Sequence, residues 1–185
     1  ILRAQSQLQP NETAAAAMTR LALDPRFLYP NTDQGREAAL AEYTTMIQDQ
    51  LQRSRAVIGL VPKAPIEVQR VPPFKEKTAP GAYYNPPALD GERPGVFYAN
   101  LRDMAEVPKF GMRTLAIHEG VPGHHFQVTL AQEQSGVPTF RKVLPFTAFS
   151  EGWALYTERL AWEMGFQKDP LDNLGIVKVG LIYKA

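Results

Sequence analysis

All three histidines of this chain stand close together, at positions 118, 124 and 125. Glu119 follows the first of them, and Pro122-Gly123 separates it from the other two. The chain contains no cysteine, so a metal ion would have to be held by histidine and carboxylate groups. Zinc accepts this combination of ligands. The cluster therefore predicts a zinc site.

The spacing of these histidines differs from that of the regular zinc-peptidase helix. There, two histidines lie four positions apart on one helix face, and a glutamate between them is the general base. His124 lies six positions after His118, which on a straight helix turns its side chain to roughly the opposite side; the seven positions to His125 restore the face but add about 10 Å along the axis. Pro122 removes a backbone donor, and Gly123 tolerates unusual backbone angles. We therefore expect a distorted helix at residues 121–123 that returns His124 to the metal.

Glu151 is the candidate for the third ligand, because a catalytic zinc held by two histidines needs another protein ligand. Its neighbours Ser150 and Gly152 favour a helix that begins at about this point, with Ser150 as the N-cap. In the alternative interpretation, Glu151 is a carboxylate that stabilises the helix dipole in the first turn.

Several other residues are candidates for supporting roles. Glu119 is the predicted general base, and a tyrosine hydroxyl could stabilise a developing oxyanion. Glu158 lies on the same helix face as Glu151, so it could orient a liganding histidine or form a surface ion pair. The predicted catalytic tyrosines are Tyr84 and Tyr98, and the predicted supporting or substrate-contacting residues are His125, Gln127 and Tyr156. For His125 the alternative is ligation of the metal. For the tyrosines the alternative is packing in the core or at its rim.

The elements that would position these residues are mostly helices. Hydrophobic periodicity and capping residues predict helices over residues 11–23, 33–58, 109–118, 124–134 and 150–164, with a last helix beginning at Asp169-Pro170. Residues 62–94 are rich in proline, with strands expected at 66–71 and 95–100 and an extended or loop segment at 81–87. We expect a mainly α fold with a small β-sheet. It would comprise a helical scaffold segment (1–61) and a catalytic region (62–185) within one continuous domain.

Composition excludes several other classes of function. Of 185 residues, 44% are hydrophobic and 21% charged, and the net charge is +1, which argues against a nucleic-acid partner. No apolar run is long enough for a membrane-spanning segment. The chain starts without methionine and ends inside a predicted helix, so we expect it to be part of a longer protein. Its oligomeric state and compartment are not indicated by composition.

Two stretches, His118 to Gln127 and Ser150 to Glu158, together resemble the bacterial domain-of-unknown-function family 885. Residues 82–98 are also similar to that family. The resemblance implies a zincin-like fold of the gluzincin type and metallopeptidase activity, with His118, His124 and Glu151 matching the metal ligands and Glu119 the base. It also implies a longer protein with a periplasmic or exported, lipid-anchored location. In the family, a helix with further Arg, Asp and His positions follows where this chain stops.

The expected function is zinc-dependent hydrolysis of a peptide or related amide bond, with water as the nucleophile. A strand at residues 95–100 could pair with an extended substrate if it lies at a sheet edge. Two alternatives remain open: a zincin-like module that binds metal without catalysis, and a non-peptide amidase or biosynthetic enzyme on the same scaffold.

Overall fold

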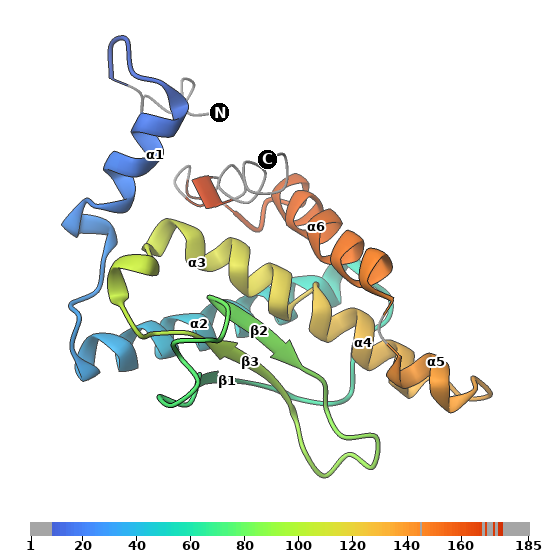
Figure 1. Cartoon of the computed structure of the whole chain (residues 1–185). Coiled ribbons are helices and arrows are strands. Elements are labelled where there is room, and N and C mark those ends of the chain that lie inside the picture. The colour runs from blue at the N-terminus through green and yellow to red at the C-terminus, as the bar shows by residue number, and fades with distance from the viewer. Residues whose placement is uncertain (1–8, 145, 168, 170–171, 173, 176–185) are drawn as a thin grey trace.

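A long helix and a small sheet form the base of the structure, a computed structural model that describes residues 9–144, 146–167, 169, 172 and 174–175. Figure 1 shows the sheet in front of α2, with the later helices above and beside it. In chain order the elements are α1 (Ala14–Ala22), η1 (Pro25–Phe27), α2 (Asp33–Val57), β1 (Ile66–Arg70), β2 (Ala82–Asn85), β3 (Gly95–Ala99), η2 (Met104–Glu106), α3 (Lys109–Leu115), η3 (Ala116–Gly120), α4 (His124–Glu133), α5 (Thr139–Val143) and α6 (Thr147–Glu163). The described part of the chain is mainly helical with one three-stranded sheet, as expected.

The two N-terminal helices begin where their capping residues predict. The Thr13 hydroxyl accepts a hydrogen bond from the Ala16 amide at the start of α1, and Thr32 does the same for Gly35 at the start of α2. The buried side chains of α2 include Ala39, Tyr43, Met46 and Ile47, at the spacing of one helix face. This face packs on the sheet.

The sheet has the strand order β1-β3-β2, with β1 parallel and β2 antiparallel to β3. Both expected strands are present, and the segment at 81–87 contains the edge strand β2. The prediction that residues 95–100 form an edge strand is wrong. Both sides of β3 are already paired, so its backbone groups are not open to a substrate, and Phe97 at its centre is buried against Tyr43.

The helix α6 begins at Thr147, three residues before the expected start. Its N-cap is Phe146, whose side chain makes no capping hydrogen bond, so no polar residue marks the true start in the sequence. Ser150 is therefore not the cap, and Glu151 lies beyond the first turn. This position weakens the interpretation of Glu151 as a carboxylate that serves the helix dipole.

One hydrophobic cluster joins the early and late parts of the chain. Its buried members come from α2, β3, α3, η3 and α4, among them Tyr43, Phe97, Met112, Ala116 and Phe126. Among the described helices, none is both long enough and apolar enough to cross a bilayer. The helix expected to begin at Asp169-Pro170 lies, beyond Asp169 and a few isolated positions, outside the described residues.

Candidate metal centre

The helix that carries His118 breaks as expected, and the distortion starts earlier than predicted. From Ala116 to Gly120 the backbone forms a wider π-helical turn, closed by a 3.2 Å hydrogen bond from the Val121 amide to the Ala116 carbonyl. Val121 is extended, as is usual before proline, and α4 then starts afresh at His124. π turns of this kind are frequently found at functional sites.

Gly123 is required at this break because two backbone carbonyls approach it closely. A Cβ atom there would lie 2.0 Å from the His118 carbonyl oxygen and 2.2 Å from that of Ile117. The Gly123 amide donates to the same Ile117 carbonyl at 3.0 Å. Only a residue without a side chain allows the chain to fold back this tightly.

The break brings His118 and His124 together with Glu151. The Nε2 atom of His118 lies 3.4 Å from one carboxylate oxygen of Glu151, and that of His124 lies 3.6 Å from the other. One potential ligand atom from each residue lies within 4.8 Å of the other two. Ligands about 2.0–2.2 Å from a tetrahedral zinc are separated by about 3.4 Å. The three predicted ligands therefore form a cluster that fits zinc.

In both His118 and His124, the ring nitrogen that faces away from Glu151, Nδ1, has a polar partner of its own. Glu158 accepts a 2.7 Å hydrogen bond from Nδ1 of His118, and the hydroxyl of Ser150 lies 3.3 Å from Nδ1 of His124. Such contacts set the ring orientation and leave Nε2 free for a metal. The predicted supporting role of Glu158 agrees with this contact; its alternative as a surface ion pair does not, since Glu158 is 3% exposed.

Burial and neighbouring charges shift the proton affinities of these rings in opposite directions. Burial alone would lower the pKa of His118, yet the hydrogen bond with Glu158 and the nearby carboxylates raise it overall. Burial and the charge of His118 lower the pKa of His124 to about 4. A neutral His124 is the form that binds a metal.

Glu119, the predicted general base, is buried beside this cluster. Burial, aided by the charges of Glu151 and Glu158 and opposed by His118, raises its pKa to about 7. A cation bound nearby would lower this pKa, because it stabilises the carboxylate. Two cavities, described below, open at the site. Glu119 lines both of them, so its side chain is accessible to a ligand in either cavity.

His125 is occupied by other groups and is not part of the cluster. Its Nδ1 lies 2.8 Å from the Tyr84 hydroxyl and 3.3 Å from that of Thr129, and it shares a backbone hydrogen bond with Ala64. Burial lowers its pKa to about 4, so the ring is neutral and Nδ1 accepts a hydrogen bond from a hydroxyl. His125 therefore joins α4 to the edge strand and to the segment before β1.

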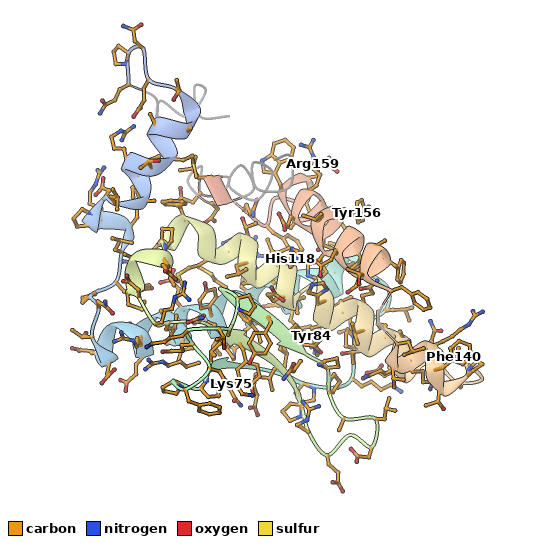
Figure 2. The ribbon with its side chains drawn as sticks, viewed as in Figure 1. Lys75, Tyr84, His118, Phe140, Tyr156 and Arg159 are labelled. Carbon is orange, nitrogen blue, oxygen red and sulfur yellow. The ribbon has the colours of Figure 1, made fainter. Side chains whose placement is uncertain are left out.

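The remaining predicted site residues lie in different surroundings. The hydroxyl of Tyr84 is engaged with His125, and burial raises its pKa. Tyr98 stacks on Tyr83 at a ring distance of 5.0 Å and lines neither cavity, so its predicted catalytic role gains no support. Tyr156 is 54% exposed and packs against Trp153. Figure 2 shows His118 near the centre, with Tyr84 on the sheet and Tyr156 on α6 on either side of it.

Gln127 lines the same cavity as the predicted metal ligands. Its side-chain amide donates to the Phe149 carbonyl at 3.3 Å, which connects α4 with α6. Two further residues have contacts at the site that were not predicted from the sequence: the Ser150 hydroxyl lies beside His124, and the Trp153 indole donates a hydrogen bond to the Pro122 carbonyl. Their only signal was adjacency to Glu151, because both act through contacts between distant segments.

Two cavities meet at the cluster. The larger, of about 890 Å³, extends from His118, Glu119, His124 and Glu151 along β2 towards α5 and the start of α6. The second, of about 530 Å³, lies on the other side of Pro80 and Ala82 and also reaches His118 and Glu119. The candidate metal centre is therefore accessible from a cleft rather than enclosed in the core.

The fold and the cluster define a mainly helical region in which two histidines and a glutamate could hold a metal ion. Residues 1–183 match the model of the family described as "Bacterial protein of unknown function (DUF885)", and the chain belongs to this family. The search of curated proteins finds no match.

Two solved structures share the architecture. A "putative lipoprotein" from Colwellia psychrerythraea is 39% identical, with a TM-score of 0.91, over 97% of this chain and 31% of that one. A "putative lipoprotein of unknown function" from Shewanella oneidensis is 20% identical, with a TM-score of 0.66, over 97% of this chain and 33% of that one. The second likeness concerns the fold alone. This chain spans about a third of the length of both structures.

Proposed function

We propose that this chain forms the active-site region of a zinc-dependent hydrolase, a zincin-like metallopeptidase of the gluzincin type. The observation that supports this proposal most directly is the position of two histidine Nε2 atoms. Those of His118 and His124 both lie close to the carboxylate of Glu151, at the wall of an open cavity. A purely structural zinc site normally has four protein ligands and no open position. Three protein ligands beside an open cavity match a catalytic zinc site, which keeps a position open for water or substrate.

Each residue of the site has a role in hydrolysis. His118, His124 and Glu151 would hold the zinc, which supplies a Lewis acid that polarises an amide carbonyl and lowers the pKa of water. Glu119 accepts a proton from the attacking water as the new C–O bond forms at the carbonyl carbon. It then delivers that proton to the nitrogen as the C–N bond breaks, which yields a carboxylic acid and an amine.

The two histidine rings must also be held in the orientation that points Nε2 at the metal. A zinc-binding imidazole is normally fixed through its other nitrogen, and Glu158 and Ser150 provide such partners for the two rings. The buried Glu158 also adds negative charge behind His118, which makes that ring a stronger ligand.

The substrate is expected to lie along β2. This strand is paired on one side only, and its residues Ala82, Tyr83 and Tyr84 line the larger cavity next to the histidines. An extended peptide can add to such an edge through backbone hydrogen bonds. We therefore assign substrate pairing to β2 and not to residues 95–100, whose strand β3 lies in the centre of the sheet.

The lipoprotein description of the 39% identical structure from Colwellia psychrerythraea supports a location outside the cytoplasm, as the family resemblance implied. We therefore propose that the protein is exported and lipid-anchored.

Metal analysis and peptide hydrolysis test the proposal together. The purified protein should contain one zinc per chain, with an anomalous peak at the zinc edge between His118, His124 and Glu151. It should cleave members of a peptide library, stop after chelation, and recover when zinc is restored. Absence of metal from the cluster, or a zinc-loaded protein inert towards the whole library, would overturn it.

A further inference from the structure

The larger cavity has an uneven distribution of charge. Among the described residues that line it, the acidic ones are Glu119 and Glu151, at the candidate metal centre. Its cations are Arg93, in the loop after β2, and Arg141 and Lys142, on α5. The part of the wall that these three residues form is therefore positively charged, although the whole chain has a net charge of only +1.

These cations are not neutralised by carboxylates. Lys142 donates to the Gln132 carbonyl at 2.9 Å, and Arg93 contacts the Pro94 carbonyl at 3.4 Å. Within the described ranges, neither they nor Arg141 form an ion pair with an acidic side chain. Most other described arginines of the chain do have such a partner, so the charge here is available to a ligand.

Arg93 lies within electrostatic reach of the edge strand. Burial raises the pKa of the Tyr84 hydroxyl, and the positive charge of Arg93 opposes that effect. Arg93 and Tyr84 both line the larger cavity, so the guanidinium group borders the space in which the substrate is proposed to lie.

Exposed apolar side chains line the same cavity. Leu89 comes from the loop after β2, and the others come from α5 and the start of α6. All are at least half exposed, which is unusual for so many large hydrophobic residues on one wall: Leu89, Val143, Leu144, Phe146 and Phe149. An apolar wall next to cations matches a ligand that carries both an apolar group and an anion.

We infer that the substrates of this site carry a carboxylate in the larger cavity, bound by Arg93 and Arg141, with an apolar residue between that carboxylate and the bond to be cleaved. Guanidinium groups match carboxylates in charge and in planar geometry. The apolar wall favours an amino-acid residue over a phosphate-rich ligand. The inference rests on the proposed function and names its substrate class.

The carboxylate could be a peptide C-terminus or an acidic side chain, and three peptides of one apolar sequence distinguish these sources. The first has a free C-terminus, the second an amidated C-terminus, and the third an amidated C-terminus preceded by Asp. Binding is measured by fluorescence anisotropy to the zinc-loaded Glu119→Gln protein, and kcat/KM is measured with the unaltered protein.

We expect one or both carboxylate peptides to bind roughly tenfold or more tightly than the neutral amide, as expected for a charged hydrogen bond. If only the peptide with the free C-terminus binds more tightly, the site recognises the C-terminal carboxylate. If that peptide and the Asp peptide both bind more tightly to the same extent, the site accepts a carboxylate of either source. Combining Arg93→Gln with Arg141→Gln should abolish the preference. Arg55→Gln, an exposed cation on α2 that lines neither cavity, should leave it unchanged.

Equal binding of the neutral amide overturns the inference, as does a preference that survives in the double arginine variant. The two failures are separable. Hydrolysis without carboxylate preference contradicts the substrate class alone, whereas carboxylate-selective binding by a zinc-loaded protein that cleaves none of the peptides contradicts the proposed hydrolase.

Discussion

The indole nitrogen of Trp153 donates a 2.9 Å hydrogen bond to the carbonyl oxygen of Pro122. This contact joins α6, the helix that carries Glu151, to the turn that separates His118 from His124. The three potential ligands come from two segments of the chain, and this bond connects those segments beside the cluster. We therefore expect the geometry of the three potential ligands to depend on it.

Replacement of Trp153 by Phe should weaken both stability and metal binding. The change removes the donor and leaves the Pro122 carbonyl without this partner, at a cost of about 1–3 kcal/mol in the free energy of unfolding. Zinc affinity, measured by competition with a chelator, should fall as well. Trp162→Phe is the matched control, because Trp162 lies on the same helix and stacks on Arg159 at the surface. Equal effects of the two changes would refute the coupling.

Gly123→Ala should disrupt the break in the helix. The new methyl group would overlap the carbonyl oxygens of Ile117 and His118, so the turn must open and His124 must move. We expect a loss of about 3 kcal/mol or somewhat less in unfolding free energy, the range of overpacking, together with loss of zinc. Gly152→Ala is the control: it has open space around it in α6, and there alanine should stabilise by about 0.5–1 kcal/mol. A Gly123→Ala protein with full zinc content would contradict this role.

Glu158→Gln should reduce metal affinity without removing the metal site. The change keeps a hydrogen-bond acceptor near Nδ1 of His118 but removes the negative charge. Loss of such a partner typically lowers metal affinity by about 10–100-fold. Glu163→Gln, which removes an exposed carboxylate paired with Arg159 on the same helix, should leave the affinity unaltered. Titration with zinc under competition measures both, and an unaffected Glu158→Gln protein would argue against the orienting role.

Glu119→Gln should keep the metal and lose turnover. The amide occupies nearly the same space but cannot accept the proton of the attacking water, so kcat should fall by about 10²–10⁴-fold. Zinc content, measured on the same preparation, should stay at the level of the unaltered protein. Glu37→Gln, an exposed change on α2, is the control for both quantities. Normal hydrolysis by Glu119→Gln would rule out this general base.

Tyr84→Phe distinguishes a structural hydroxyl from a catalytic one. The hydroxyl donates to the buried His125, so its removal should lower the free energy of unfolding by about 1–3 kcal/mol while kcat changes little. Tyr83→Phe, one residue away and stacked on Tyr98, should have a smaller effect on stability. A large fall in kcat with unchanged stability would instead restore Tyr84 as the oxyanion donor predicted from the sequence.

The sequence by itself determined which side chains are candidates for the site and the local shape of the chain around them. Two histidines, a glutamate and the absence of cysteine restrict the metal chemistry, and a spacing of six residues across Pro122-Gly123 requires the helix to break. Helices with polar caps and strong periodicity, such as α2, could also be predicted, because capping and burial of one face are properties of neighbouring residues.

Only the tertiary structure decided which groups act on one another across the fold. It engages the Tyr84 hydroxyl with His125, and it pairs β3 on both sides so that β2, not β3, lies at an edge of the sheet. It also starts α6 before Ser150, whose hydroxyl then lies near His124. Each of these outcomes depends on packing between segments tens of residues apart. Hydrogen-bond partners at that separation leave no periodic or capping signal in the chain. The candidate ligands could therefore be named from the sequence, whereas the contacts of Ser150 with His124 and of Tyr84 with His125 could not.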